Sequence, residues 1–485
     1  MEPGYLVVVV PGIGGTELAV PGDRSRRIWT VGFGNIASSL VRPDRLSVSE
    51  HPTLQPVGLI KTRKAFGIWT AIHGYDGLLA GLTAGGSALP DTRLDDGTKP
   101  EPDLDANVVA AGYDFRLGVA SAAQELEDAI QPRLRHLWPK PEDRANKVFF
   151  VTHSMGGLVA RYWAAQQDNR HLCRLVLTLG TPHRGAPKAL DILANGLAIR
   201  GRHVVKWPRR MLREWQSMYD LLPRYQAVAD HSPTSSVATM YPKDLPAPWW
   251  DATRAGEAFA MHEFLREYWS DPGWVGKPHL EPRLGYGHGT LQRCTWDGRR
   301  VSVTNDAQAD LQLGRWDDLG GDGTVPSFCA MPIEMSNDLP TGFLEQQRHG
   351  RLAVLPTVAA WVRKSLGYPS LEAIHGEKRP VVLGVGMEPV LQPRVPSPIL
   401  AEVRGVQDSP VEAIVRAEVV ACDNSGKPPL VAELVWDGST ETFRGVIPGL
   451  ESGLYDVTVM AEEVPGAGDL ETSETVEVVE DDDLD

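Results

Sequence analysis

Cysteine is scarce in this 485-residue sequence, and the four cysteines present are Cys173, Cys294, Cys329 and Cys422. No two of them have the C-x-x-C spacing of a zinc or redox site, and four cysteines in so long a chain exclude a disulfide-dense scaffold. Cys173 and Cys329 lie in apolar stretches, so we expect them to be buried free thiols. This scarcity favours a reducing cytoplasm, and we predict neither a metal nor any other cofactor.

Long apolar runs and an excess of basic residues are absent as well. No uninterrupted apolar segment approaches the ~20 residues that span a bilayer, so we expect no transmembrane segment. Residues 1–10 lack a basic region ahead of their short apolar run, and we therefore expect no secretory leader. The formal net charge of −15 argues against nucleic acid as a partner. Part of that charge lies in residues 481–485, which we interpret as a solvated acidic tail.

Short apolar runs alternate with helical patterns in the first part of the chain. Four runs have the size and the continuous apolar character of strands buried on both faces, namely residues 5–10, 106–111, 148–152 and 173–180. Apolar residues recur at helical spacing in residues 122–138 and 158–165. Strands that alternate with helices favour a mostly parallel sheet with helices on both faces, so the predicted fold class is α/β.

The strand predicted at 148–152 runs into the motif around which the chain is organised. Ser154 stands in a turn with Gly156 and Gly157, and a helical pattern begins immediately afterwards. A strand, a serine in a glycine-rich turn and a helix form the context in which a G-x-S-x-G motif presents a nucleophile. Thr152 stands where the motif has its first glycine, which departs from the pattern. We predict that Ser154 is a catalytic nucleophile.

A serine hydroxyl needs a neighbouring base to accept its proton and a third group to orient that base. In α/β-hydrolases these groups follow the chain order nucleophile, acid, histidine. Asp322, between glycines in a predicted loop, and His349, ahead of a helix predicted at 355–366, satisfy this order. Competing acids and histidines lack the glycine-flanked setting or the right place in the order; they are Asp317, Asp318, His153, His183 and His375.

A glycine-rich loop at residues 11–16 follows the first predicted strand. A phosphate-binding interpretation is weak because no Lys-Ser or Lys-Thr pair follows the glycines. In an α/β-hydrolase a loop in this place supplies one backbone N–H of the oxyanion hole, and Ile13 is the expected donor. Asp114 and Arg116, after the second strand, are alternative catalytic groups, but we favour an ion pair that braces the end of the strand.

The composition changes twice further along the chain. Residues from about 190 to 316 hold eight of the fourteen tryptophans, and we interpret them as a Trp-rich cap over an apolar substrate cleft. Past about 380, short alternating segments separated by turn residues predict an all-β sandwich.

The expected organisation has three parts and a tail. A catalytic domain at 1–375 precedes a linker at 376–398 and an immunoglobulin-like sandwich at 399–480. We expect the catalytic domain to hydrolyse esters without the sandwich, because few contacts should cross a Pro-rich boundary. The sandwich is where we would expect a protein partner to bind.

Five motifs, in order, resemble those of the lecithin:cholesterol acyltransferase family, which also includes lysosomal phospholipases and bacterial lipase-like proteins. They lie at residues 10–16, 113–117, 152–157, 179–183 and 321–326. The resemblance extends from residue 5 to about 365 and leaves out the sandwich. It implies Ser154 as nucleophile, Asp322 and His349 as its partners, and Ile13 with Met155 as backbone oxyanion donors. It also implies a serine hydrolase or acyltransferase that acts on acyl esters of lipids.

Two other functions stay open. In the first, the chain is a scaffold that binds a partner and whose hydrolase fold is a relic; the presence of Ser154, Asp322 and His349 together argues against it. In the second, a closed pocket makes the protein a short-chain carboxylesterase.

Overall fold

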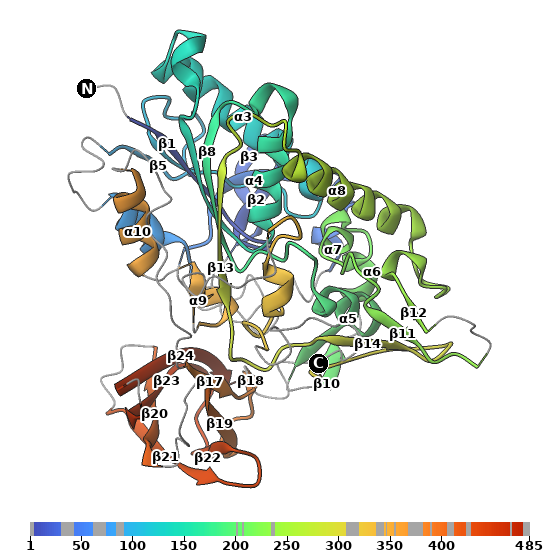
Figure 1. Ribbon diagram of the computed structural model, residues 1–485, viewed down its shortest axis with the longest axis vertical. Helices are drawn as coiled ribbons and strands as arrows, with labels where there is room; N and C mark the ends of the chain where they lie inside the picture. The colour runs from blue at the N-terminus through green and yellow to red at the C-terminus, as the bar shows by residue number, and fades with distance from the viewer. Residues whose placement is uncertain are drawn as a thin grey trace.

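The computed structural model describes residues 4–30, 43–61, 74–83, 92–199, 202–205, 208–233, 238–306, 320–335, 344–345, 347–353, 356–366, 382–388, 390–404, 412–422, 428–465 and 468–478. A seven-stranded parallel sheet lies at the centre of the larger part (Figure 1), in the order β16-β13-β8-β7-β1-β6-β5. Its strands are β1 (Leu6–Val10), β5 (Leu94–Asp95), β6 (Val108–Ala110), β7 (Val148–His153), β8 (Cys173–Leu179), β13 (His279–Gly285) and β16 (Leu344–Glu345). The predicted α/β class is confirmed, and the four strands expected from the sequence are the neighbours β8, β7, β1 and β6.

Both faces of this sheet are covered, which explains why its strands are continuously apolar. Alternate residues of a strand point to opposite faces. Leu6 and Val8 of β1 belong to a core that includes residues of α3 (Val119–Leu137) and α4 (Met155–Ala165). Val7 and Val9 belong to a second core with residues of α2 (Asp76–Thr83) and α10 (Pro356–Leu366).

An antiparallel sheet in the order β3-β2-β4 follows β1 in the chain. It consists of β2 (Thr16–Val20), β3 (Asp23–Trp29) and β4 (Gln55–Leu59). The described 3-10 helices of the larger part are Pro43–Leu46, Pro141–Arg144, Gln167–Asn169, Pro242–Asp244 and Ser327–Ala330.

The expected cap, at about 190–316, is not one continuous insertion. Residues 279–285 form β13, which pairs with β8 inside the central sheet. Pro282 and the charged residues beside it hide this strand from a hydropathy pattern. The region begins within α5 (Pro187–Asn195). Its other described helices and strands are β9 (Leu197–Ile199), β10 (Arg202–Val205), α6 (Pro208–Leu212), α7 (Gln216–Asp220), β11 (Val228–Asp230), β12 (Thr239–Met240), α8 (Ala252–Ser270), β14 (Arg293–Trp296) and β15 (Val301–Thr304).

The C-terminal part is an all-β sandwich, as predicted, and lies beside α9 (His349–Leu352) in Figure 1. Its strand order is β17-β19-β22-β21-β20-β23-β24-β18. The strands are β17 (Val382–Gly386), β18 (Val390–Leu391), β19 (Ser397–Arg404), β20 (Ile414–Ala421), β21 (Leu430–Asp437), β22 (Thr442–Ile447), β23 (Gly453–Val464) and β24 (Gly468–Val478). Strands β17 and β18 lie within the residues that we expected to be a linker. The immunoglobulin-like character stays a prediction.

Candidate active site

Ser154 occupies the sharp turn between β7 and α4 that the sequence indicates. Its backbone angles are φ 52° and ψ −129°, a conformation that is strained for a residue with a side chain. The glycine at 156 allows this turn, because a Cβ on Gly156 would lie 2.5 Å from the Pro11 carbonyl oxygen. Thr152, the departure from the motif, is accommodated: it is buried, and its hydroxyl donates to the Leu177 carbonyl at 2.8 Å.

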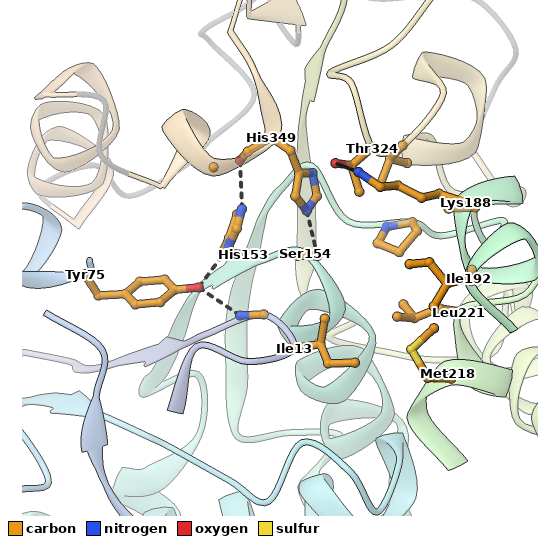
Figure 2. Close-up of a pocket in the computed structure, with 16 residues that line it drawn as sticks. Ile13, Tyr75, His153, Ser154, Lys188, Ile192, Met218, Leu221, Thr324 and His349 are labelled. Atoms are coloured by element: carbon orange, nitrogen blue, oxygen red, sulfur yellow. Dashed lines mark hydrogen bonds between the residues drawn. The ribbon is translucent and has the colours of Figure 1, made fainter. Parts of the chain in front are cut away.

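The structure brings together Ser154 from the turn before α4, His349 from the start of α9 and Asp322 from a loop. His349 Nε2 lies 2.8 Å from Ser154 Oγ, and His349 Nδ1 lies 2.7 Å from Asp322 Oδ2 (Figure 2 shows the first contact). A carboxylate only accepts hydrogen bonds, so Nδ1 carries the proton and Nε2 accepts from the serine hydroxyl. The backbone adds a further connection, since the His349 N–H donates to the Asp322 carbonyl at 2.9 Å.

Asp322 is buried but remains ionised. Burial raises the pKa of its carboxyl, but His349 and two backbone amides lower that pKa more, and the net pKa lies below the usual 3.8. The amides are those of Thr324 and Val325, which donate to Oδ1 at 2.9 and 2.7 Å. Gly180 makes room for the pair, because a Cβ there would lie 2.9 Å from Asp322 Oδ2. The carboxylate is therefore held in one position and one charge state.

The loop expected to form part of an oxyanion hole lies beside Ser154. Ile13 and Ser154 line the same pocket, and Met155 begins α4 directly after the serine. Gly12 is not free to donate, because its N–H donates to the Tyr75 hydroxyl at 2.9 Å. In the part of the chain that the structure describes, the N–H groups of Ile13 and Met155 have no acceptor.

A hydrogen-bonded chain that the sequence did not reveal runs through Tyr75 and His153. The Tyr75 hydroxyl accepts from Gly12 and lies 2.9 Å from His153 Nδ1, while His153 Nε2 lies 2.9 Å from the His349 carbonyl oxygen (Figure 2). That carbonyl only accepts, so Nε2 carries the proton and the tyrosine donates to Nδ1. Burial, and then the neighbouring His349, lower the pKa of His153 to about 3, so the ring stays neutral. The chain links the Gly12 loop to the backbone of His349.

A pocket with about 740 Å³ of empty space, including the part open to solvent, lies against Ser154 and His349. Its wall is mainly apolar, with Ala189, Ile192, Met218 and Leu221 among the residues that line it. None of the described tryptophans lines this pocket, contrary to our expectation for the cap. Instead, the buried tryptophans of this region pack in the protein core, where their large apolar surface is removed from water. They are Trp215, Trp269, Trp274 and Trp296.

The competing residues have structural roles or lie outside the described chain. Arg116 pairs with Asp114 at 2.6 Å, both fully buried, so the predicted brace is present. His183 is buried against Arg161 and does not line the pocket. Positions 317, 318 and 375 lie outside the described residues.

Metal sites, membrane-spanning helices and disulfides can be assessed only for the described residues. Among them, no group of His, Cys, Asp and Glu side chains could hold a metal ion. None of the described helices has both the length and the apolarity that crossing a bilayer requires. The described cysteines form no disulfide, and Cys173 and Cys329 are buried thiols as predicted.

Comparisons with known proteins match one segment of the chain to a family of alpha/beta domains. Residues 119–204, which include the Ser154 turn, match the family described as PGAP1-like alpha/beta domain. This match covers less than half of the chain and does not confirm the resemblance to the lecithin:cholesterol acyltransferase family. No curated protein matches the chain. A crystal structure of the Bacillus licheniformis lipase BlEst2 in propeptide form aligns with 98% of this chain and 93% of that one, at 10% identity and a TM-score of 0.33.

Proposed function

We propose that this protein is a serine hydrolase that cleaves or transfers the acyl groups of lipid-like carboxylic esters. The observation that carries the proposal is the continuous hydrogen-bonded chain from Ser154 through His349 to Asp322. Each member comes from a different segment of the chain, and no structural need requires a buried carboxylate, an imidazole and a serine in that order at a pocket. The match of residues 119–204, around Ser154, to a PGAP1-like alpha/beta domain supports the alpha/beta fold on which the proposal relies.

In the proposed mechanism, His349 Nε2 accepts the Ser154 proton while Oγ attacks the ester carbonyl carbon. The imidazolium is stabilised by Asp322, and the oxyanion accepts hydrogen bonds from the Ile13 and Met155 amides. The intermediate collapses as the C–O bond to the alcohol breaks, and His349 donates its proton to the departing alkoxide. Water or an alcohol, deprotonated by His349, then attacks the acyl-enzyme and releases the acid or a new ester.

The pocket supports an apolar acyl chain as the group that is bound. Its apolar wall begins at Ser154 and continues along α5 and α7, through Ile192 and Met218. Each methylene removed from water contributes about 0.8 kcal/mol. We therefore expect kcat/KM to rise several-fold from two-carbon to eight-carbon acyl esters of nitrophenol. A decline beyond four carbons would favour the short-chain carboxylesterase instead.

A fluorophosphonate probe separates an enzyme from a scaffold. The proposal predicts covalent labelling at Ser154, located by peptide mass spectrometry, and no labelling of Ser154→Ala. Thr152→Ser is a matched control in the same turn, because it keeps the hydroxyl that donates to Leu177 and leaves the nucleophile in place. Absence of labelling in the folded wild-type chain would refute the hydrolase and leave the scaffold.

A further inference from the structure

Lys188 is a basic side chain in the wall of the mainly apolar pocket. It lies in the first turn of α5, and its amine donates to Thr324 Oγ1 over a long 3.4 Å (Figure 2). Among the described residues, no carboxylate forms an ion pair with this amine. Asp322 is close enough to influence the pKa of Lys188 but forms no ion pair with it, and its oxygens accept from His349 and from two backbone amides.

Lys188 is half-buried, and an ammonium that is partly withdrawn from water without a counter-ion is unfavourable. Burial lowers the pKa of Lys188, and the nearby charge of Asp322 opposes that effect. An anion that entered the pocket would supply the missing counter-charge and accept charge-assisted hydrogen bonds from the amine. Thr324 would add a hydroxyl donor beside it, since its backbone is fixed by Asp322.

We propose that Lys188 and Thr324 bind an anionic group of the substrate, a phosphate or carboxylate that belongs to the same molecule as the ester. This inference rests on the proposed hydrolase function and narrows its substrate class. The preferred substrate is an ester that is mainly apolar and carries one acidic group, which reaches Lys188 when the ester carbonyl lies at Ser154.

The test compares two nitrophenyl esters of equal acyl length, the hexanoate and the monoester of adipate, whose far end is a carboxylate. We expect Lys188→Met to lower the ratio of kcat/KM for the anionic ester over the neutral ester by about 10- to 100-fold. Lys147→Met is the control, because Lys147 also donates to one oxygen at 3.4 Å but lies far from the pocket wall. An unchanged ratio in Lys188→Met would overturn the proposal.

A second pair of substrates identifies the source of the anion. Hydrolysis of short-chain phosphatidylglycerol is compared with that of diacylglycerol of the same chain length, in wild type and in Lys188→Met. A ratio that falls in the variant assigns the anion to a phospholipid head group, and a change confined to the adipate pair assigns it to a small acidic ester. If the wild type reacts with neither substrate nor fluorophosphonate, the hydrolase proposal itself fails.

An independent set of contacts joins the sandwich to the segments that carry His349 and Asp322. Arg348 and Arg351 stand on either side of His349 in the chain and pair with the sandwich residues Glu474 and Asp456, at 2.8 and 3.1 Å. The first contact is ionic, because its angle does not meet hydrogen-bond geometry. Arg348 also donates through Nη2 to the Val385 carbonyl of β17 at 2.7 Å.

The Asp322 loop is connected to β17 as well, through His288. The His288 N–H donates to the Gly321 carbonyl at 3.0 Å, and the Gly321 N–H donates back at 3.1 Å. His288 Nδ1 in turn lies 3.2 Å from the Val385 carbonyl oxygen. The Val385 carbonyl thus accepts from Arg348, beside His349, and from His288, which pairs with the Asp322 loop. Glu474 is 4% exposed, and burial raises the pKa of its carboxyl to about 7, although Arg348 and Arg351 lower it.

We infer that the sandwich is a positioning element of the active site, and that Glu474, through Arg348, holds His349 at hydrogen-bond distance from Ser154. A domain that merely bound a partner would not need a buried ion pair, Arg348 with Glu474, on the residue that precedes the base. The sandwich is therefore required for turnover, in place of the independence that we expected from the sequence.

Full-length variants test this inference. We expect Glu474→Gln and Asp456→Asn to lower kcat and the rate of fluorophosphonate labelling, by about tenfold or more for Glu474→Gln, with little change in KM. Glu462→Gln is the control, because Glu462 lies in the same strand as Asp456 and pairs with Arg416 inside the sandwich. Asp456 is the milder site if Glu474→Gln does not fold. Melting temperatures that fall while kcat and labelling stay at wild-type values would overturn the positioning role.

Discussion

Replacing Tyr75 by phenylalanine removes one hydroxyl from the chain that joins Gly12, His153 and His349. That hydroxyl accepts from the Gly12 N–H and donates to His153 Nδ1, each over 2.9 Å. Tyr75 is only 1% exposed, so water does not replace the lost oxygen without a rearrangement. The variant leaves one donor and one acceptor unpaired inside the protein.

The magnitude follows from these two groups. A buried polar group without a partner costs about 1–3 kcal/mol, so for the two groups we expect the free energy of unfolding to fall by about 2–6 kcal/mol. We also expect kcat to fall by roughly 10- to 100-fold, because Gly12 precedes the Ile13 donor, and loss of one oxyanion donor costs ~10²–10³. We expect a smaller loss for Tyr75→Phe because the Ile13 N–H is displaced and not removed.

Urea unfolding gives the first quantity, and ester turnover under native conditions gives the second. Tyr5→Phe is the matched control, because it also removes one tyrosine hydroxyl, which bonds Arg174 away from the pocket. Tyr75→Phe with wild-type stability and wild-type kcat would refute the network. A loss of stability with unchanged kcat would show that the network does not position the Gly12 loop.

The remaining predictions concern the turn and the buried histidines. Thr152→Val should cost about 1 kcal/mol of stability, measured by urea unfolding, and Thr152→Gly should not raise activity, because the threonine already fits the turn. Gly156→Ala should abolish turnover or soluble expression, since its Cβ would meet the Pro11 carbonyl oxygen at 2.5 Å. Burial lowers the pKa of His262 to about 4. Between about pH 6.5 and pH 4 the unfolded chain therefore binds a proton at His262 that the folded protein does not bind, which stabilises the unfolded state. Wild type should therefore lose ~3 kcal/mol relative to His262→Asn between pH 7 and pH 4, and a constant difference across that range would contradict this origin.

The Ser154 turn was predictable because its signal is local. The strand, the serine, the two glycines and the helix follow one another in the chain, and each has a steric or apolar pattern of its own. Asp322 and His349 required only the chain order of an α/β-hydrolase. Their distances from Ser154 then follow from the parallel sheet, whose strands end at one edge.

Other residues carry no local signal. Tyr75 and Lys188 join the pocket through contacts with residues far away in the chain, namely Gly12 and Thr324. Strand β13 is buried because it pairs with β8, although Pro282 and Arg283 give it no apolar pattern. The described tryptophans of residues 190–316 were misplaced because richness in tryptophan is the same for a core and for a substrate cleft. The sandwich contacts to Arg348 and Arg351 depend on how two domains dock, which composition does not encode.

The most direct test of the central claim is the turnover of nitrophenyl octanoate by Ser154→Ala, with circular dichroism and melting temperature measured on the same sample. In the proposed mechanism the acyl-enzyme ester forms through Ser154 Oγ, so the variant cannot form it. Alanine is smaller than serine and fits in the same space. The account predicts a folded variant whose kcat is at background, at least 10³-fold below wild type. A folded Ser154→Ala with near-wild-type kcat would contradict it.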